Sequence, residues 1–130
     1  MTWVEEMITK MEIAVGGVMQ IKIGDQFVVA QVSQDVVAYF KANKKLLEKV
    51  GKSVFRSFLL LINEKKQEQA FNLLLAKMDA EDIIARLEAN NQSLDQETTT
   101  NEQFVHSVTD FALNKLAPTL IKVLIGLLLA

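Results

Sequence analysis

The sequence predicts a mainly α-helical protein, a compact bundle of about five to six helices, with a short β-hairpin at 18–32 as an open alternative. Three observations support this fold class. Half of the residues are apolar and only 23% are charged, so the chain can bury enough apolar surface to fold. Apolar residues recur at steps of three and four over most of the chain, as on one face of a helix. A length of 130 residues suits one shared core, so we expect a single domain, 1–130.

The first helix is expected to begin near residue 3. Thr2 and Glu5 have the spacing of a capping box, in which the hydroxyl and the carboxylate satisfy backbone N–H groups at a helix start. Apolar residues between 7 and 15 then form one face. Gly16 and Gly17 give the backbone its greatest freedom, so the helix should end there.

Residues 18–32 fit a hairpin and a helix equally well. Ile21 and Ile23 alternate with polar residues before Gly24 and Asp25, which suit a two-residue hairpin turn. The valines of the same segment, however, continue at helical spacing into the next one. The sequence leaves both structures open.

Residues 33–62 are predicted to be helical, because apolar residues form a continuous seam along them. Gly51 is the one weak point. It either caps one helix before Ser53 starts another, or lies inside one long helix at a cost of about 1 kcal/mol relative to alanine.

The next part of the chain is predicted to hold three helices and one loop. A helix covers 64–78, and Asp79 is expected to start another, because its carboxylate suits a helix N-terminus. The polar segment 89–103 is expected to be a surface loop or a hinge. Thr100 can then cap a further helix that runs toward Pro118.

The C-terminal segment 119–130 is almost entirely apolar and is expected to be a helix, with Pro118 in its first turn. Lys122 interrupts it, which argues against a lone membrane-spanning helix. Such a helix needs cover from the protein core, an oligomer interface or lipid. The predicted partner or oligomer interface consists of Leu120, Ile121, Leu124, Ile125, Leu127 and Leu128.

Charge is unevenly distributed along the chain. The net charge of -2 supplies no overall attraction for nucleic acid, yet residues 41–56 hold six basic side chains and one acidic one. On a continuous helix, four of these basic side chains would share a face that could contact phosphate, anionic lipid or an acidic protein. The simpler interpretation is that this face is only exposed to solvent. These candidate contacts are Lys41, Lys45, Lys52 and Arg56. Residues 79–102 are acidic, so the two regions could pair within one molecule or between subunits.

No catalytic, cofactor-binding or metal-ligating residues are assigned. The chain has no cysteine, and His106 is its one histidine, so thiolate chemistry and histidine-rich metal sites are excluded within a single chain. Gly51-Lys52-Ser53 resembles the end of a phosphate-binding loop, but Leu46 occupies the position of the required first glycine. We therefore expect no enzymatic activity and no cofactor.

The sequence favours a non-enzymatic helical assembly or adaptor protein that acts through self-association, or docks a protein partner, by its apolar C-terminal helix. A homo-oligomer or a protein partner is thus expected. One alternative is membrane association through the same helix and the basic face, and another is nucleic-acid binding through 41–56, which the overall acidity disfavours. Glu5 and Glu6 are unlike a signal peptide, so a cytoplasmic location is expected, with a peripheral membrane location left open.

Overall fold

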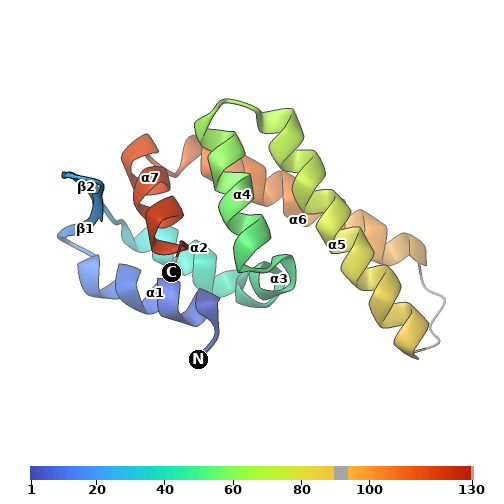
Figure 1. Cartoon of the computed structure of the whole chain (residues 1–130). Helices are drawn as coiled ribbons and strands as arrows, with labels where there is room; N and C mark the ends of the chain where they lie inside the picture. Colours follow the sequence, from blue (N-terminus) through green and yellow to red (C-terminus); the bar gives the residue numbers. More distant parts are fainter. Residues whose placement is uncertain (90–93, 130) are drawn as a thin grey trace.

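The computed structural model describes residues 1–89 and 94–129 (Figure 1). The described part is mainly helical, which confirms the predicted fold class, and it contains seven helices and one antiparallel hairpin. The elements are α1 (Trp3–Ala14), β1 (Val18–Ile23), β2 (Gln26–Gln31), α2 (Gln34–Ala42), α3 (Lys44–Val50), α4 (Lys52–Asn63), α5 (Gln67–Ala89), α6 (Leu94–Asn114) and α7 (Pro118–Leu127).

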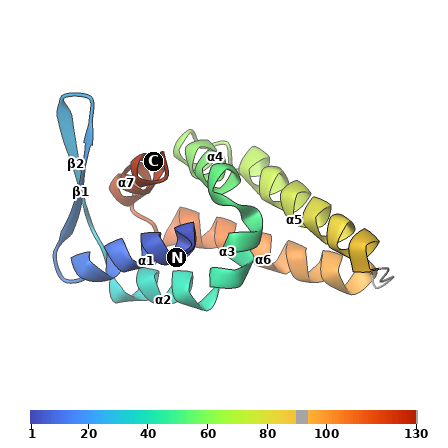
Figure 2. The same cartoon turned by 60° about the horizontal axis from the view of Figure 1, so that its bottom comes forward.

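The helices enclose one cluster of buried apolar side chains. Helices α1 and α2 lie side by side, α5 and α6 form an antiparallel pair, and α7 lies between the hairpin and α4 (Figure 2). Aromatic rings join three of these helices. Phe40 on α2 meets Phe55 on α4 and Phe111 on α6 edge to face, with ring centroids 6.2 and 5.5 Å apart.

The start of α1 follows the predicted cap. The hydroxyl oxygen of Thr2 accepts the backbone N–H of Glu5 at 3.2 Å, and the same hydroxyl donates to the Glu5 carboxylate at 3.3 Å. The helix ends at Ala14, and Gly16 follows with a φ of 83°, a conformation that side chains with a Cβ disfavour.

Residues 18–32 form the hairpin. Strands β1 and β2 pair in register from Val18 opposite Gln31 to Ile23 opposite Gln26. Gly24 has a φ of 62°, as a type II′ turn requires at its first central position. The helical alternative for this segment is therefore wrong.

The predicted helical stretch 33–62 is divided into three helices, whereas the two interpretations of Gly51 allowed two helices or one. Gly51 has a φ of 87° and separates α3 from α4, so it does not lie inside a helix. The second break, at Asn43, was not predicted. The Asn43 side-chain amide donates to the backbone oxygen of Tyr39 at 2.9 Å and thereby satisfies a carbonyl at the end of α2.

Three predictions between 64 and 114 were wrong. Asp79 does not start a helix, because α5 continues through it to Ala89. The predicted loop 89–103 is largely helical, since α6 begins at Leu94; residues 90–93 lie outside the described part. Thr100 therefore lies within α6 instead of capping it.

The helical structure of the polar segment is explained by Asn101, which is buried where α5 and α6 pack together. Its amide donates to Asp79 at 3.1 Å and also to Asp82, both on α5. Polar side chains that find such partners on a neighbouring helix can stay helical despite weak intrinsic propensity.

The C-terminal segment is a helix with Pro118 in its first turn, as predicted. Lys122 is exposed on it, whereas most of its apolar side chains are buried. Among the described residues, no helix has both the length and the apolar character that crossing a bilayer would require.

Candidate functional site

The six apolar residues of the predicted interface lie mostly inside the core of their own chain. Five are buried and Leu127 is half-buried; the buried ones are Leu120, Ile121, Leu124, Ile125 and Leu128. They pack among the chain's own helices and the hairpin. A partner could not contact them while α7 stays docked, so an interface has to be sought on other surfaces.

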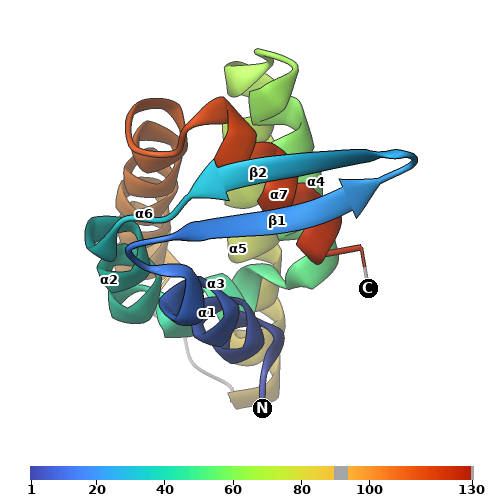
Figure 3. The same cartoon turned by 90° about the vertical axis from the view of Figure 1, so that its left-hand side faces the viewer.

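The hairpin covers α7 (Figure 3). Met19 and Ala30, which are directly opposite each other, are buried on the inner face of the two strands. Ile21 lies on the same face against Gly126, where an added Cβ would come within 2.6 Å of Ile21 Cδ1. A glycine in α7 thus permits the close approach between helix and strand.

The other face of the hairpin is exposed. Side chains of a strand alternate between its two faces, so Val18, Phe27 and Val29 lie opposite to the residues that contact α7. These three side chains are 53%, 61% and 45% exposed. We call this surface the outer hairpin face; it consists of Val18, Gln20, Lys22, Phe27, Val29 and Gln31.

A second group of exposed apolar side chains lies near the end of α5, at Ile83, Ile84 and Leu87. Ile83 and Ile84 are adjacent in α5, and Leu87 follows about one helical turn later, so the three side chains form a narrow strip. This strip is the main alternative to the outer hairpin face as an interaction surface.

The predicted basic face is not a single helix face. Lys41 lies on α2, Lys45 on α3, and Lys52 and Arg56 on α4, because the chain breaks at Asn43 and Gly51. Lys41 forms an ion pair with Glu12 at 3.3 Å. Arg56 Nε donates to the backbone oxygen of Ile125 at 3.3 Å, which ties α4 to α7. Lys45 is exposed and forms no ion pair with any residue that the structure describes.

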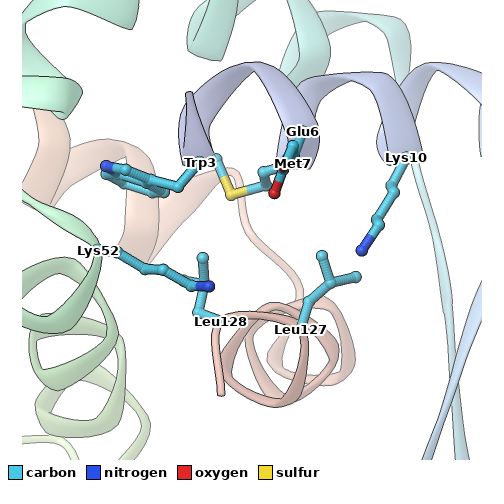
Figure 4. A pocket seen from close by; sticks show the side chains of 7 residues that line it. All are labelled: Trp3, Glu6, Met7, Lys10, Lys52, Leu127 and Leu128. Carbon is cyan, nitrogen blue, oxygen red and sulfur yellow. The ribbon is translucent and has the colours of Figure 1, made fainter. Parts of the chain in front are cut away.

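Lys52 and Leu127, predicted for two different surfaces, line the same small cavity between α1, α4 and α7 (Figure 4). Trp3, Lys10 and Leu128 are among its other walls. The cavity has a volume of only about 50 Å³, enough for a few water molecules and too small for an organic ligand.

The basic and acidic regions meet within the molecule. Lys49 of α3 forms an ion pair with the buried carboxylate of Asp82 on α5, which also accepts the Asn101 amide. Lys44 pairs with Glu5 at 3.3 Å, and its hydrogen bond holds the pKa of Glu5 below its ordinary value. The ion pair of Lys49 with Asp82 thus joins the predicted basic and acidic regions within one molecule, between α3 and α5.

Tyr39 is a half-buried group with a raised pKa. Its ring stacks on Phe111 at 3.8 Å and its hydroxyl lies 2.9 Å from Ser107 Oγ. Burial is the main cause of the raised pKa, and the negative charge of Asp110 adds to it, whereas the hydrogen bond with Ser107 opposes it.

Titration of tyrosinate absorbance should therefore give a pKa for Tyr39 above 10.0. Tyr39 is the only tyrosine, so the signal reports this side chain alone. The pKa of Tyr39 is higher in the folded protein than in the unfolded chain, so the neutral side chain contributes to the stability of the fold. This contribution is complete below the pKa of the unfolded chain and is lost as the pH rises through the pKa of the folded protein. Ser107→Ala should raise the pKa of Tyr39 further, and a lowered value would contradict the assigned contact.

His106 is exposed, and its ring centroid lies 4.6 Å from that of Phe71. Among the side chains that the structure describes, no three of histidine, aspartate or glutamate gather as metal ligands.

Sequence reasoning missed the outer hairpin face. The alternation in 18–23 was the available signal, but helical spacing competed with it.

Comparison with known proteins gives no match: no protein-family model, no curated protein and no solved structure matches this chain.

Proposed function

We propose that this chain is a non-enzymatic assembly module that associates with a second copy of itself through the outer hairpin face. The observation that carries the proposal is the exposure of Val18, Phe27 and Val29 on one face of a sheet whose other face is already covered by α7. A two-stranded sheet gains stability from cover on an apolar face, and here one face remains open to solvent.

The composition of the outer hairpin face suits an interface. Its three apolar side chains expose on the order of 300 Å², comparable with the largest apolar patch of many monomers. Gln20 and Gln31 are polar but uncharged, and Lys22 is the only charged side chain on the face, so little charge would lose its hydration.

A second copy is the partner that this geometry favours. Two twisted sheets stack face to face at about 10 Å, and the same face on each copy would supply both halves of a two-fold interface. A stable dimer buries about 800 Å² on each partner, so the interface has to extend from the three apolar side chains over the polar residues of the face and the surface beside it.

The test replaces Phe27 and Val29 with serine together. Sedimentation velocity and light scattering should show a dimer for the unmodified chain and a monomer for the double variant, with circular dichroism unchanged. Ile84→Ser is the matched control, because Ile84 is 50% exposed on α5, outside the hairpin. That variant should remain dimeric.

Three outcomes would overturn the proposal. The unmodified chain could stay monomeric at concentrations of about 100 µM, which exceed the dissociation constants of ordinary specific complexes. Ile84→Ser could dissociate the dimer, which would place the interface on α5. The chain could instead float with liposomes in a manner that the double substitution abolishes, which would identify a lipid surface as the partner of the hairpin.

A further inference from the structure

A hollow lies between the start of α5 and the second half of α6, away from the hairpin and α7. Its volume is about 360 Å³, within the range of sites for small molecules. It is lined by Gln67, Glu68 and Phe71 from α5 and by His106, Thr109 and Asp110 from α6.

The lining combines two aromatic rings with two carboxylates. The Phe71 and His106 ring centroids are 4.6 Å apart at an angle of 50°, so the two rings form a continuous wall. No lysine or arginine lines the hollow. Among the described residues, neither Glu68 nor Asp110 has an ion pair. Negative charge beside aromatic faces is the environment that organic cations prefer.

Thr109 supplies an independent indication. Its side chain is only 6% exposed, and in the described part of the chain its Oγ1 has no hydrogen-bond partner. A buried hydroxyl without a partner is unfavourable and uncommon in folded proteins. Because Thr109 lines the hollow, a change of its χ1 rotamer would turn this oxygen toward a donor bound there.

The position of Glu68 has a simpler explanation when taken alone, because carboxylates are favoured in the first turn of a helix. That explanation does not account for Asp110 on the facing helix, for the paired rings or for the partnerless Thr109 hydroxyl. The start of α5 contributes roughly half a positive charge, which the two carboxylates outweigh.

We propose that this hollow binds a small organic cation, a protonated alkylamine or an alkylguanidinium. Glu68 and Asp110 neutralise its charge, and its alkyl part lies against Phe71 and His106. Once the Thr109 side chain has rotated toward the hollow, one of the N–H groups of the cation donates to Thr109 Oγ1. This site uses none of the residues of the outer hairpin face, so the inference is independent of self-association.

The probe is agmatine, which carries both a guanidinium and an ammonium group. Titration into the ¹⁵N-labelled full chain should shift amide resonances of residues 67–71 and 106–110 selectively. Glu68→Gln and Asp110→Asn should each weaken binding by about threefold to fivefold, the range expected for an exposed charge contact. Glu102→Gln is the matched control, since Glu102 is exposed on α6 but does not line the hollow, and it should leave the affinity unchanged.

Thr109→Val tests the hydroxyl contact, because valine keeps the shape of threonine and removes its oxygen. This variant should fold, resist urea at least as well as the unmodified chain, and bind agmatine more weakly. Unchanged affinity in Thr109→Val would refute the hydroxyl contact, and equal losses for Glu68→Gln and Glu102→Gln would reduce the binding to non-specific attraction. Absence of selective shifts at 10 mM agmatine would overturn the site.

A second titration separates the two sources of such a cation. A short peptide with one arginine and acetylated and amidated ends presents the guanidinium as a side chain. Equal or tighter binding of the peptide would assign the hollow to a protein side chain, whereas binding of agmatine alone would assign it to a free amine.

Discussion

Deletion of residues 119–130 is expected to leave a chain that no longer folds. The deletion removes most of α7, whose buried side chains include Leu120, Val123 and Leu124. Each buried side chain of this kind contributes about 1.5 to 3 kcal/mol. The six that the deletion removes therefore contribute about 9 to 18 kcal/mol, which is as large as the 5 to 15 kcal/mol by which a typical domain is stable. Circular dichroism and solubility after expression would measure the loss.

Other outcomes of the deletion have distinct meanings. A folded product of lower oligomeric state would assign α7 to an interface between copies. A folded, more soluble monomer that loses affinity for liposomes would assign α7 to a lipid surface instead. Either result would contradict the burial of α7 in the core of its own chain.

A matched pair of single substitutions gives the same test without shortening the chain. Leu124→Asp places an unpaired charge at a fully buried position and should unfold the protein. Lys122→Asp changes charge on the same helix at an exposed position and should leave the fold intact. Comparable damage from both substitutions would show that α7 is sensitive to charge for some reason other than burial.

Phe40→Ala should lower the free energy of unfolding by about 3 to 5 kcal/mol, the range found when buried phenylalanines are removed. Phe40 lies between Phe55 and Phe111 and joins α2, α4 and α6, so its loss leaves a cavity where three helices meet. Urea denaturation followed by circular dichroism measures the change.

Leu87→Ala is the control for this substitution. Leu87 is 78% exposed on α5, so its loss should change the free energy of unfolding by no more than about 0.5 kcal/mol. If Phe40→Ala cost as little as Leu87→Ala, the aromatic contacts between the three helices would not contribute to stability.

Local signals in the sequence were reliable where one short-range interaction decides the structure. Thr2 caps α1, and Pro118 lies in the first turn of α7, because a hydroxyl or a ring with a restricted φ acts on the residues next to it. The same holds for the turn at Gly24, whose positive φ matches the requirement of a two-residue hairpin loop.

The hairpin itself could not be chosen from the sequence, because its valines satisfy the period of a strand and that of a helix. Contact with α7 decides between them, since Gly126 leaves room for Ile21 and the strands cover the helix. The same contact determines which hairpin side chains stay exposed. The outer hairpin face is therefore a product of tertiary packing.

Composition also misled at residues 94–103, where polar residues predicted a loop and the structure has a helix. The amide of Asn101 finds carboxylates on α5, a contact between residues about twenty positions apart that no local pattern reveals. The hollow lined by Phe71 and His106 arises from the same pairing of α5 with α6.

The sequence by itself determined that the chain is mainly helical, where its first and last helices begin, and that its C-terminal helix requires cover, because apolar spacing and helix caps act over a few residues. Only the tertiary structure decided what provides that cover, which apolar side chains remain exposed on the hairpin, and which basic residues are paired. Those outcomes depend on contacts between distant segments, whose free energies outweigh the small local preferences of the chain.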